Sequence, residues 1–311
     1  IEALYAIAWA GAVAVPLNTR WAVAENAYAI DDSTPKLLLV DKAFAEIASA
    51  LKGAKSLTAT IYLDEGEVPD GMRSYDELVA HAPIEDTSGS YNDLAGIFYT
   101  GGTTGRSKGV MLSHGNLMAN ALNALGEGLW PSSTIYLHAA PMFHLANGAA
   151  MYSVLLSGGS NVVIQSFTPD GVAAAVQKER ITDVLLVPTM IQMFVDHPTL
   201  GNYDLSSMKR IAYGASVISD AVLMRAMKAL PHVEFTQAYG MTELSPLGTL
   251  GRLKAKHADW SLEDKQKLLE KQGKSVYGID MRIVDGDGKV LPWDGKAAGD
   301  LEVRGHWVIS S

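Results

Sequence analysis

Short apolar segments alternate with amphipathic ones along much of the chain. KLLLVD (36–41) and TATIYLD (58–64) are apolar runs of strand length, and the helix-like segment AFAEIASALKG (43–53) lies between them. The same order returns where NVVIQSF (161–167) and DVLLVP (183–188) flank a helical stretch, Pro169–Arg180. Strands that alternate with helices predict mostly parallel sheets covered by helices, so we expect an α/β fold with two βαβ-type sheets.

The first ninety residues add shorter elements. The opening IEALYAIAWAGAVAVPL predicts a buried helix that ends near Gly11, followed by a strand through Pro16. Its Glu2 and its lack of a basic leader argue against a signal peptide. Residues 65–93 are polar and rich in turn formers, with one short helix expected at 74–80. Because residue 1 is not methionine, we expect the natural N-terminus to lie upstream.

The last sixty residues change in character. Lys254–Lys274 is densely charged with a helical pattern, and we expect it to be a solvated excursion. GIDMRIVDGDGKVLP (278–292) predicts two strands joined by a turn, and DLEVRG (300–305) predicts one more. DGDGK (285–289) lacks the glutamate and the spacing of an EF-hand loop, so a tight turn is favoured over a calcium site.

Composition describes a folded protein and excludes several function classes. Hydrophobic residues make up 48% of the 311 residues and charged residues 19%, values typical of a globular chain with one large or two ordinary domains. The formal net charge of −9 argues against a nucleic-acid partner, which would require clustered Lys and Arg. With no cysteine, disulfides and cysteine-bound zinc are excluded, and a cytoplasmic location fits. We expect no integral membrane segment.

A glycine-rich segment, YTGGTTGRSKG (99–109), stands between the candidate strands DLAGIFYT (93–100) and GVMLSHGNL (109–117). A turn of this composition can point several backbone N–H groups into one concavity, which is how such loops bind anions. A Walker A motif is excluded because Lys108 is followed by glycine. A flexible surface turn is the alternative, and after it Ser113 could cap a helix. Four side chains would add hydroxyl donors and a positive charge to the cradle: Thr103, Thr104, Ser107 and Lys108.

This segment and five further motifs, in the same order, resemble the adenylate-forming superfamily. That superfamily contains acyl-CoA synthetases, firefly luciferase and the adenylation domains of nonribosomal peptide synthetases, and the resemblance covers almost the whole chain. PMFHLANGAAMY, VYGIDMRIVD and LPWDGKAAGDLEVRG are most similar to the medium- and long-chain fatty acyl-CoA synthetase branch. The five motifs are AVAVPLN (12–18), PMFH (141–144), YGAS (213–216), QAYGMTE (237–243) and GDLEVRG (299–305).

The resemblance implies a two-step ligase reaction. A carboxylate attacks the α-phosphate of ATP, pyrophosphate leaves, and the CoA thiolate then attacks the acyl-adenylate. Catalysis of this kind is mainly positioning and charge neutralisation. The resemblance therefore implies ATP, Mg²⁺, CoA and a fatty acid or similar carboxylate as partners, and it leaves a homodimer open.

The resemblance also implies roles for individual residues. Residues 100–108 would hold the β- and γ-phosphates, Tyr239 would stack on adenine, and residues 214–216 would pass along the adenine edge and the acyl-pocket wall. Thr242 would bond the α-phosphate, and Glu243 would bind Mg²⁺ with Thr100 as a second contributor. The implied catalytic residues are Thr242, Glu243, His144 and Lys108. The implied nucleotide contacts are Thr100, Gly101, Gly102, Thr103, Thr104, Gly105, Ser107, Lys108, Gly214, Ala215, Ser216, Gln237, Ala238, Tyr239, Gly240, Met241 and Thr242, and the implied acyl pocket is His144, Asn147, Gly148 and Gly214.

Structural alternatives exist for each of these residues. Tyr239 could be a core aromatic and Glu243 a surface carboxylate. The presence of the glycine-rich segment in the same chain favours the nucleotide- and metal-binding roles instead. His144 has apolar neighbours and could be a core histidine; the resemblance places it beside the acyl carboxylate and favours a positioning role. His114 belongs to the beginning of a helix.

The substrate class follows from the same motif. Amino-acid-activating relatives place an aspartate there to pair with the substrate amine, whereas MFHL (142–145) offers no anion, so fatty or other amine-free carboxylates are preferred. The apolar, mostly small residues 145–150 suit an acyl chain, but they would equally suit helix packing, so the chain length stays open.

Full-length members of the superfamily continue to a ribose-binding acidic motif, a hinge and a small C-terminal domain with an adenylating lysine. We therefore expect 1–311 to be an AMP-binding N-terminal core, incomplete at both ends and without the C-terminal domain. Its expected subdomains are roughly 1–90 with 160–250, 91–160, and 275–311 as the start of a small β-barrel. Three interpretations remain: a fatty acyl-CoA synthetase, a different reaction on the same body such as an aryl-CoA ligase or a luciferase-like oxidation, and a non-catalytic nucleotide- or acyl-binding module.

Overall fold

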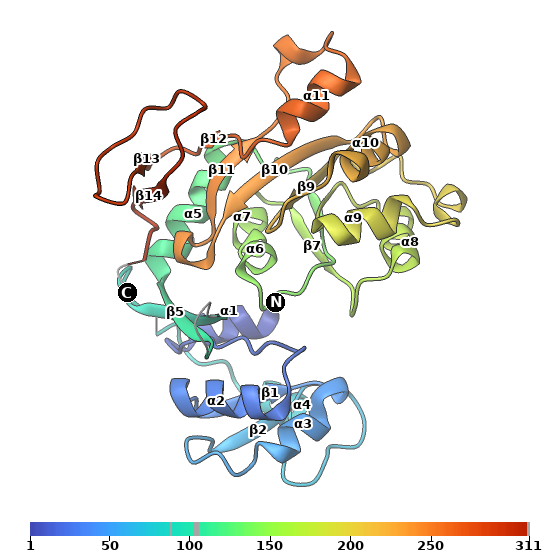
Figure 1. Cartoon of the computed structure of the whole chain (residues 1–311). Helices are drawn as coiled ribbons and strands as arrows, with labels where there is room; N and C mark the ends of the chain where they lie inside the picture. Colours follow the sequence, from blue (N-terminus) through green and yellow to red (C-terminus); the bar gives the residue numbers. More distant parts are fainter. Residues whose placement is uncertain (88, 102–105, 310–311) are drawn as a thin grey trace. The chain divides into compact units, whose positions relative to one another are not determined.

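The structure, a computed structural model, describes residues 1–87, 89–101 and 106–309. The chain forms two compact units, residues 1–114 and 115–310 (Figure 1). The predicted alternation of strands and helices is confirmed in both.

The first unit combines a small parallel sheet with a separate β-hairpin. Its elements are α1 (Glu2–Trp9), α2 (Val23–Ser33), β1 (Leu37–Val40), the 3₁₀ turn η1 (Lys42–Phe44), α3 (Ala45–Ala50), β2 (Ala59–Tyr62), β3 (Arg73–Ser74), α4 (Tyr75–Val79), β4 (Leu94–Thr100) and β5 (Lys108–Ser113). β1 pairs in parallel with β2, and β2 pairs in parallel with β3. β4 and β5 are antiparallel, with Thr100 opposite Lys108 at the end that carries the glycine-rich segment.

The second unit contains a larger, mostly parallel sheet. Its helices and turns are α5 (His114–Gly126), α6 (Leu145–Gly148), α7 (Ala150–Leu156), α8 (Pro169–Glu179), α9 (Pro188–Val195), η2 (Leu200–Asn202), α10 (Asp220–Ala229), η3 (Thr242–Leu244), η4 (Ala255–His257) and α11 (Leu262–Leu269). Its strands are β6 (Ile135–His138), β7 (Ser160–Val163), β8 (Asp183–Leu185), β9 (Arg210–Gly214), β10 (Glu234–Gly240), β11 (Leu247–Gly251), β12 (Lys274–Ser275), β13 (Ile279–Val284) and β14 (Asp300–Gly305). The sheet order is β12-β11-β10-β9-β8-β6-β7, in which β6 to β10 run parallel. β11 is antiparallel to both of its neighbours, β10 and β12.

Apolar side chains form a separate core on each face of the large sheet. Successive strand residues point to opposite faces. In β9, Ile211 and Tyr213 therefore join the core built with α8, α9 and α10, whereas Ala212 joins the core built with α5 and α7. Because both faces of the sheet are covered, residues on both sides of each strand are apolar, and the strands appear in the sequence as continuous apolar runs.

Local sequence signals set the helix ends. Thr168 caps α8 by accepting a hydrogen bond from the Gly171 amide at 3.0 Å, and Pro169 occupies the first turn, where its missing N–H costs nothing. Ser219 and Ser261 cap α10 and α11 in the same way. Of these helices, α8 and α10 cross from one parallel strand to the next and so set the edge at which the connecting loops gather.

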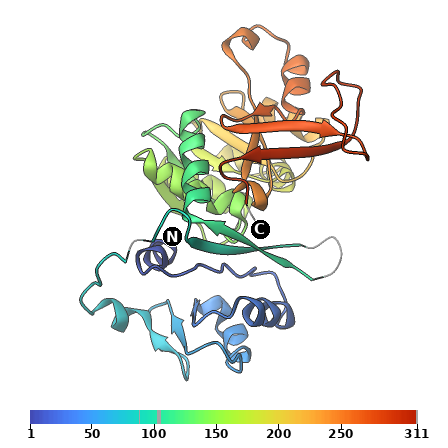
Figure 2. The ribbon, with the colours of Figure 1, turned by 90° about the vertical axis from the view of Figure 1, so that its left-hand side faces the viewer.

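Four sequence expectations differ from the structure. The opening segment forms the expected helix α1, but none of the helix residues is buried. Residue 14 makes an isolated bridge to Gly96 instead of a strand, because the preceding turn at Gly11 leaves one residue in register with β4. Val290 likewise makes only an isolated bridge, and β13 pairs along its whole length with β14 (Figure 2). The charged segment 254–274 is not wholly solvated: Leu269 is completely buried in the core, and its carbonyl accepts a 2.6 Å hydrogen bond from the Tyr213 hydroxyl.

Strand pairing joins residues from more than one of the expected subdomains. β6, within the expected 91–160 body, lies in one sheet with β7 to β11, whose residues fall almost entirely within the expected 160–250 range. β1 to β3 form a sheet of their own. The physical reason is the crossover by α8, which returns the chain from β7 to the other side of β6 and continues the same sheet.

Candidate functional site

Three of the expected motifs follow parallel strands of the large sheet and leave it at the same edge. PMFH follows β6, Gly214–Ser216 ends β9, and Tyr239–Glu243 ends β10. Strand order reverses beside β6, because β7 lies on one side of it and β8 on the other. In open α/β sheets, ligands bind outside the carboxyl ends of the strands at such a switch point.

The end of β9 is a strained turn. An added Cβ at Gly214 would lie 2.0 Å from the Ala238 carbonyl oxygen, so only glycine permits the close approach of β9 to β10. Ala215 then adopts a left-handed backbone with φ of +65°, which is unfavourable for a residue with a side chain. Ala215 and Ser216 are exposed, whereas Gly214 is buried. The nucleotide assignment therefore suits residues 215 and 216, and Gly214 serves the strand contact.

The end of β10 is equally constrained. The β10–β11 register shifts between Tyr239 and Gly240, and a Cβ at Gly240 would lie 1.9 Å from the Pro246 carbonyl oxygen. Tyr239, Thr242 and Glu243 are half-buried, and Met241 is exposed. Tyr239 is thus not a fully buried core aromatic. Its partial exposure leaves ring surface for a ligand.

Gln237 and Ala238 belong to the sheet interior. Gln237 is 5% exposed and its Nε2 donates a 2.7 Å hydrogen bond to Oε1 of Gln272, in the segment after α11. Ala238 packs against the core that contains Leu250. Their assignment as nucleotide contacts rests on the motif alone, and the packing gives both a structural role.

The loop after β6 separates an exposed residue from buried ones. His144 is exposed and precedes α6, so it is not a core histidine. Asn147 is 1% exposed, accepts a 3.0 Å hydrogen bond from the Tyr136 hydroxyl and donates one of 2.6 Å to the Ala140 carbonyl. A Cβ at Gly148 would lie 2.6 Å from the Met142 carbonyl oxygen. Asn147 and Gly148 therefore shape the loop from inside, and His144 is the group of this motif that faces outward.

Sequence reasoning missed His138, the last residue of β6. It is 2% exposed, lies 2.9 Å from Asn161 through Nε2, and has its ring 4.8 Å from that of Tyr136. Burial lowers the pKa of His138, and the Asn161 hydrogen bond opposes this. Its Nδ1 is a buried atom without a hydrogen-bond partner among the described residues. A polar residue at the end of an apolar strand was the only sequence signal.

In the first unit, the hairpin holds the described part of the glycine-rich segment. Thr100 ends β4 and is half-buried, Gly101 is exposed, Ser107 is half-buried, and Lys108 begins β5 with an exposed side chain. The remaining members, Gly102, Thr103, Thr104 and Gly105, lie outside the described residues. The two stems of the loop are thus placed, with one hydroxyl and one cation opposite each other across the strands.

The predicted magnesium ligands come from both units, Thr100 from the first and Glu243 from the second. The donor chemistry fits a hard cation, because both groups offer oxygen. Glu243 is half-buried and takes part in no ion pair within residues 1–87, 89–101 and 106–309. Over the same ranges, no cluster of three or more acidic or histidine side chains has metal-binding spacing.

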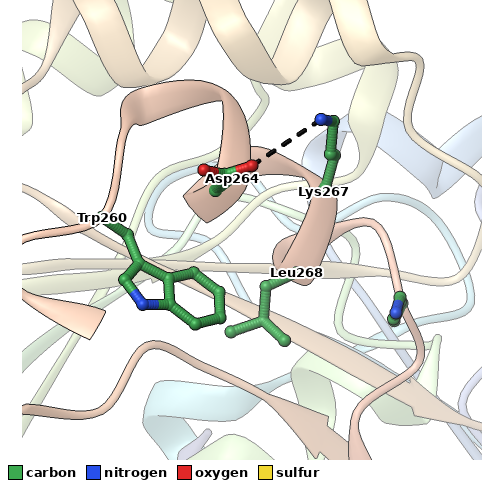
Figure 3. Close-up of a pocket in the computed structure, with 5 residues that line it drawn as sticks. Trp260, Asp264, Lys267 and Leu268 are labelled. Carbon is green, nitrogen blue, oxygen red and sulfur yellow. Dashed lines mark ion pairs between the residues drawn. The ribbon is translucent and has the colours of Figure 1, made fainter. Parts of the chain in front are cut away.

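A cavity of about 310 Å³ lies beside α11, away from these motifs (Figure 3). The indole of Trp260 and the side chain of Leu268 line it, and Asp264 pairs with Lys267 at 3.7 Å. No motif residue contributes to the lining, which consists of Trp260, Asp264, Lys267, Leu268 and Lys271. We therefore do not include this cavity in the candidate site.

A family model described as AMP-binding enzyme matches residues 1–311. The chain belongs to the AMP-binding enzymes. It is 33% identical to a feruloyl-CoA synthase from Amycolatopsis, over 99% of this chain and 59% of that protein. It is 30% identical to a medium-chain-fatty-acid–CoA ligase from Ectopseudomonas oleovorans, over 99% and 58%. The resemblance to adenylate-forming enzymes is confirmed.

Solved structures of this family share the fold. A long-chain-fatty-acid–CoA ligase from Archaeoglobus fulgidus matches with a TM-score of 0.85 at 27% identity, over 99% of this chain and 61% of that one. ATP-bound MatB from Rhodopseudomonas palustris matches with a TM-score of 0.82 at 28% identity, over 99% and 59%. The N-terminal domain of FACL13 from Mycobacterium tuberculosis matches in fold, with a TM-score of 0.84 at 22% identity over 99% and 73%. The expected α/β class is confirmed.

This AMP-binding chain spans about 60% of the length of the curated relatives that it matches. In the part of the chain that the structure describes, no helix has both the length and the apolar character required to cross a membrane.

Proposed function

We propose that this chain is the nucleotide- and acyl-binding core of an AMP-forming acid–CoA ligase, which joins a carboxylic acid to CoA at the expense of ATP. The observation that carries the proposal is that the loops after β6, β9 and β10 all leave the carboxyl edge of the sheet, with the switch point beside β6. The family match over the whole chain and the ATP-bound neighbour support it.

Six exposed or half-buried motif residues have proposed tasks. Lys108 and Thr100, on the two stems of the loop, would neutralise and bond the β- and γ-phosphates, while Thr242 would bond the α-phosphate. The half-exposed ring of Tyr239 would stack on adenine. Mg²⁺, held by Thr100 and Glu243, would offset phosphate charge when bound. His144, exposed at the start of α6, would position the carboxylate.

For the acid, we propose an amine-free carboxylate, with a medium- or long-chain fatty acid first. The His144 segment offers no carboxylate to hold a substrate amine. An aryl acid is the second candidate, because the feruloyl-CoA synthase from Amycolatopsis is 33% identical. Small residues at 146 and 148–150 fit either group, so the acid panel below separates them.

The test assays the protein encoded by the whole gene beside the 311-residue chain. Each is incubated with ATP, Mg²⁺, CoA and one acid from a panel of octanoate, palmitate, ferulate and phenylalanine, and AMP and thioester are quantified by mass spectrometry. We expect the whole protein to form octanoyl- or palmitoyl-CoA with equimolar AMP. The 311-residue chain should bind ATP and form far less thioester.

Different outcomes overturn different parts of the proposal. Thioester from ferulate alone would replace the fatty acid by the aryl acid. Activity with phenylalanine alone would contradict the argument from His144. Absence of acid-dependent AMP release with every acid, in a folded whole protein, would refute the ligase proposal and favour a binding module.

A further inference from the structure

One face of α2 contacts two residues of the glycine-rich segment, one from each of its sides. Tyr28 and Asp32 are four residues apart, so they share one stripe of the helix. Tyr99 lies in β4, one residue before Thr100 ends that strand, and Arg106 lies in the loop, two residues before β5 begins. All four residues belong to the first unit and lie within the described ranges.

Tyr99 reaches α2 from the end of β4. Its hydroxyl lies 2.7 Å from Oδ2 of Asp32 and 3.1 Å from the Ala29 carbonyl oxygen, both acceptors. Burial, and next the Asp32 carboxylate, raises the pKa of Tyr99, which keeps the phenol protonated as the donor. The ring also makes an edge contact with Trp21, with 6.0 Å between centroids.

The last glycine of the segment makes room for this contact. Gly109 is opposite Tyr99 in the β4–β5 register. A Cβ at Gly109 would lie 2.7 Å from Cγ2 of Ile97 and 3.3 Å from Cζ of Tyr99. A larger residue would therefore clash with the Ile97 side chain and press against the Tyr99 ring. The glycine serves this packing, which neither a turn nor an anion requires.

Arg106 reaches the same stripe from the other side of the loop. Its guanidinium carbon lies 5.2 Å from the centroid of the Tyr28 ring, a cation–π distance. The positive charge of Arg106 therefore interacts with the Tyr28 ring on α2. The residue two positions later, Lys108, has its side chain exposed.

We propose that Tyr28 and Asp32 are positioning residues that fix the two stems of the glycine-rich loop, and with them Thr100 and Lys108, for a nucleotide triphosphate. The proposal rests on the proposed ATP binding. Because Tyr99 and Arg106 are both held by one rigid helix, α2 sets the separation of the stems. Loss of either contact lowers the fraction of molecules with the stems in place, and the apparent affinity falls by that fraction.

The first experiment compares ATP with AMP by calorimetry on the 311-residue chain. Tyr28→Leu should weaken ATP binding about threefold, the size of an exposed cation–π contact. Asp32→Asn should weaken it about fivefold, because a hydrogen bond to a charged acceptor becomes a neutral one. AMP, which lacks the β- and γ-phosphates, should bind all variants alike. Tyr28→Phe, which keeps the ring face, should restore ATP binding.

Asp31→Asn is the matched control. Asp31 is exposed on the next position of α2 and is absent from the Tyr99 and Arg106 contacts. Both substitutions remove one negative charge, and this long-range effect should by itself strengthen the binding of anionic ATP slightly. A weaker ATP affinity in Asp32→Asn alone would therefore report the lost Tyr99 contact and not the change in charge. Equal changes in both variants would overturn the role of Asp32.

A double-mutant cycle separates positioning from direct phosphate contact. If Arg106 acts through Tyr28, Tyr28→Leu should have no further effect on ATP affinity in an Arg106→Met background. Additive effects of the two substitutions would overturn the coupling. Melting temperatures of all variants should agree within about 2 °C, which excludes global unfolding as the cause.

Tryptic cleavage after Lys108 tests the anchor without any nucleotide. Tyr28→Leu and Asp32→Asn should be cleaved there several-fold faster than the wild type and Asp31→Asn, as local opening becomes easier. Unchanged cleavage in both variants would overturn the anchor even if ATP affinity fell. A wild type that does not bind ATP would refute the proposed function, and the cleavage rates would still decide whether α2 holds the stems.

Discussion

Gly214→Ala is expected to break the closest strand contact at the candidate site. The added Cβ would lie 2.0 Å from the Ala238 carbonyl oxygen, whereas ordinary contacts begin at 3.4 Å, so β9 and β10 must separate by roughly the difference. Both partners are backbone in a two-sided core, and no flexible side chain can yield. Overpacking costs about 1–3 kcal/mol, and the loss of one ladder hydrogen bond adds about 1 kcal/mol. We expect about 3 kcal/mol of destabilisation, or a melting point about 6–12 °C lower for a unit of this size.

Urea denaturation followed by circular dichroism measures this change, and hydrogen exchange of peptides from β10 localises it. Gly201→Ala is the control, because its Cβ would have nothing within 4 Å and its backbone φ is ordinary. It should change the unfolding free energy by less than about 0.5 kcal/mol. Should Gly214→Ala match this control and leave β10 exchange unchanged, the close approach of the two strands, and the role assigned to Gly214, would be refuted.

Four further predictions address the site and its support. Lys108→Ala should weaken ATP binding about tenfold by calorimetry, because a charge-assisted phosphate bond is lost, and unchanged affinity would refute its role. Glu243→Gln in the whole protein should slow pyrophosphate release far more than it weakens acid binding, and ordinary kinetics across a magnesium titration would contradict the metal role. Burial lowers the pKa of His138, so the unfolded chain binds a proton at this residue more readily than the folded chain. The free energy of unfolding should therefore fall as the pH drops below about 6.5, and His138→Gln should reduce this pH dependence between about pH 7.5 and 5.5. Asp183→Ala removes the 3.1 Å partner of half-buried Arg210, which keeps Glu234 at 3.2 Å, and should cost about 1.5–3 kcal/mol; ATP affinity should stay unchanged because Asp183 and Arg210 lie at the amino ends of their strands.

The α/β class, the main strands and helices, and the order of the motifs could all be predicted from the amino-acid sequence. These follow from local signals: apolar runs of strand length, helical periodicity, and caps such as Thr168 with Pro169 lie within a few neighbouring residues. The candidate site residues, such as His144 and Lys108, were proposed from the resemblance of short motifs to a known family. Motif order identified the family without knowledge of any long-range contact.

The packing roles of many of those residues became visible only in the folded protein. Gly214 permits the close approach to Ala238, and Gly109 leaves room for Ile97 and the ring of Tyr99. Asn147, expected in an acyl pocket, uses both ends of its amide inside the protein, and Leu269 of a charged segment is fully buried. Each of these roles depends on a strand or helix brought alongside by a crossover or a hairpin. A pattern with a period of two or 3.6 residues specifies which side of an element is apolar, but not which backbone atom will lie opposite it.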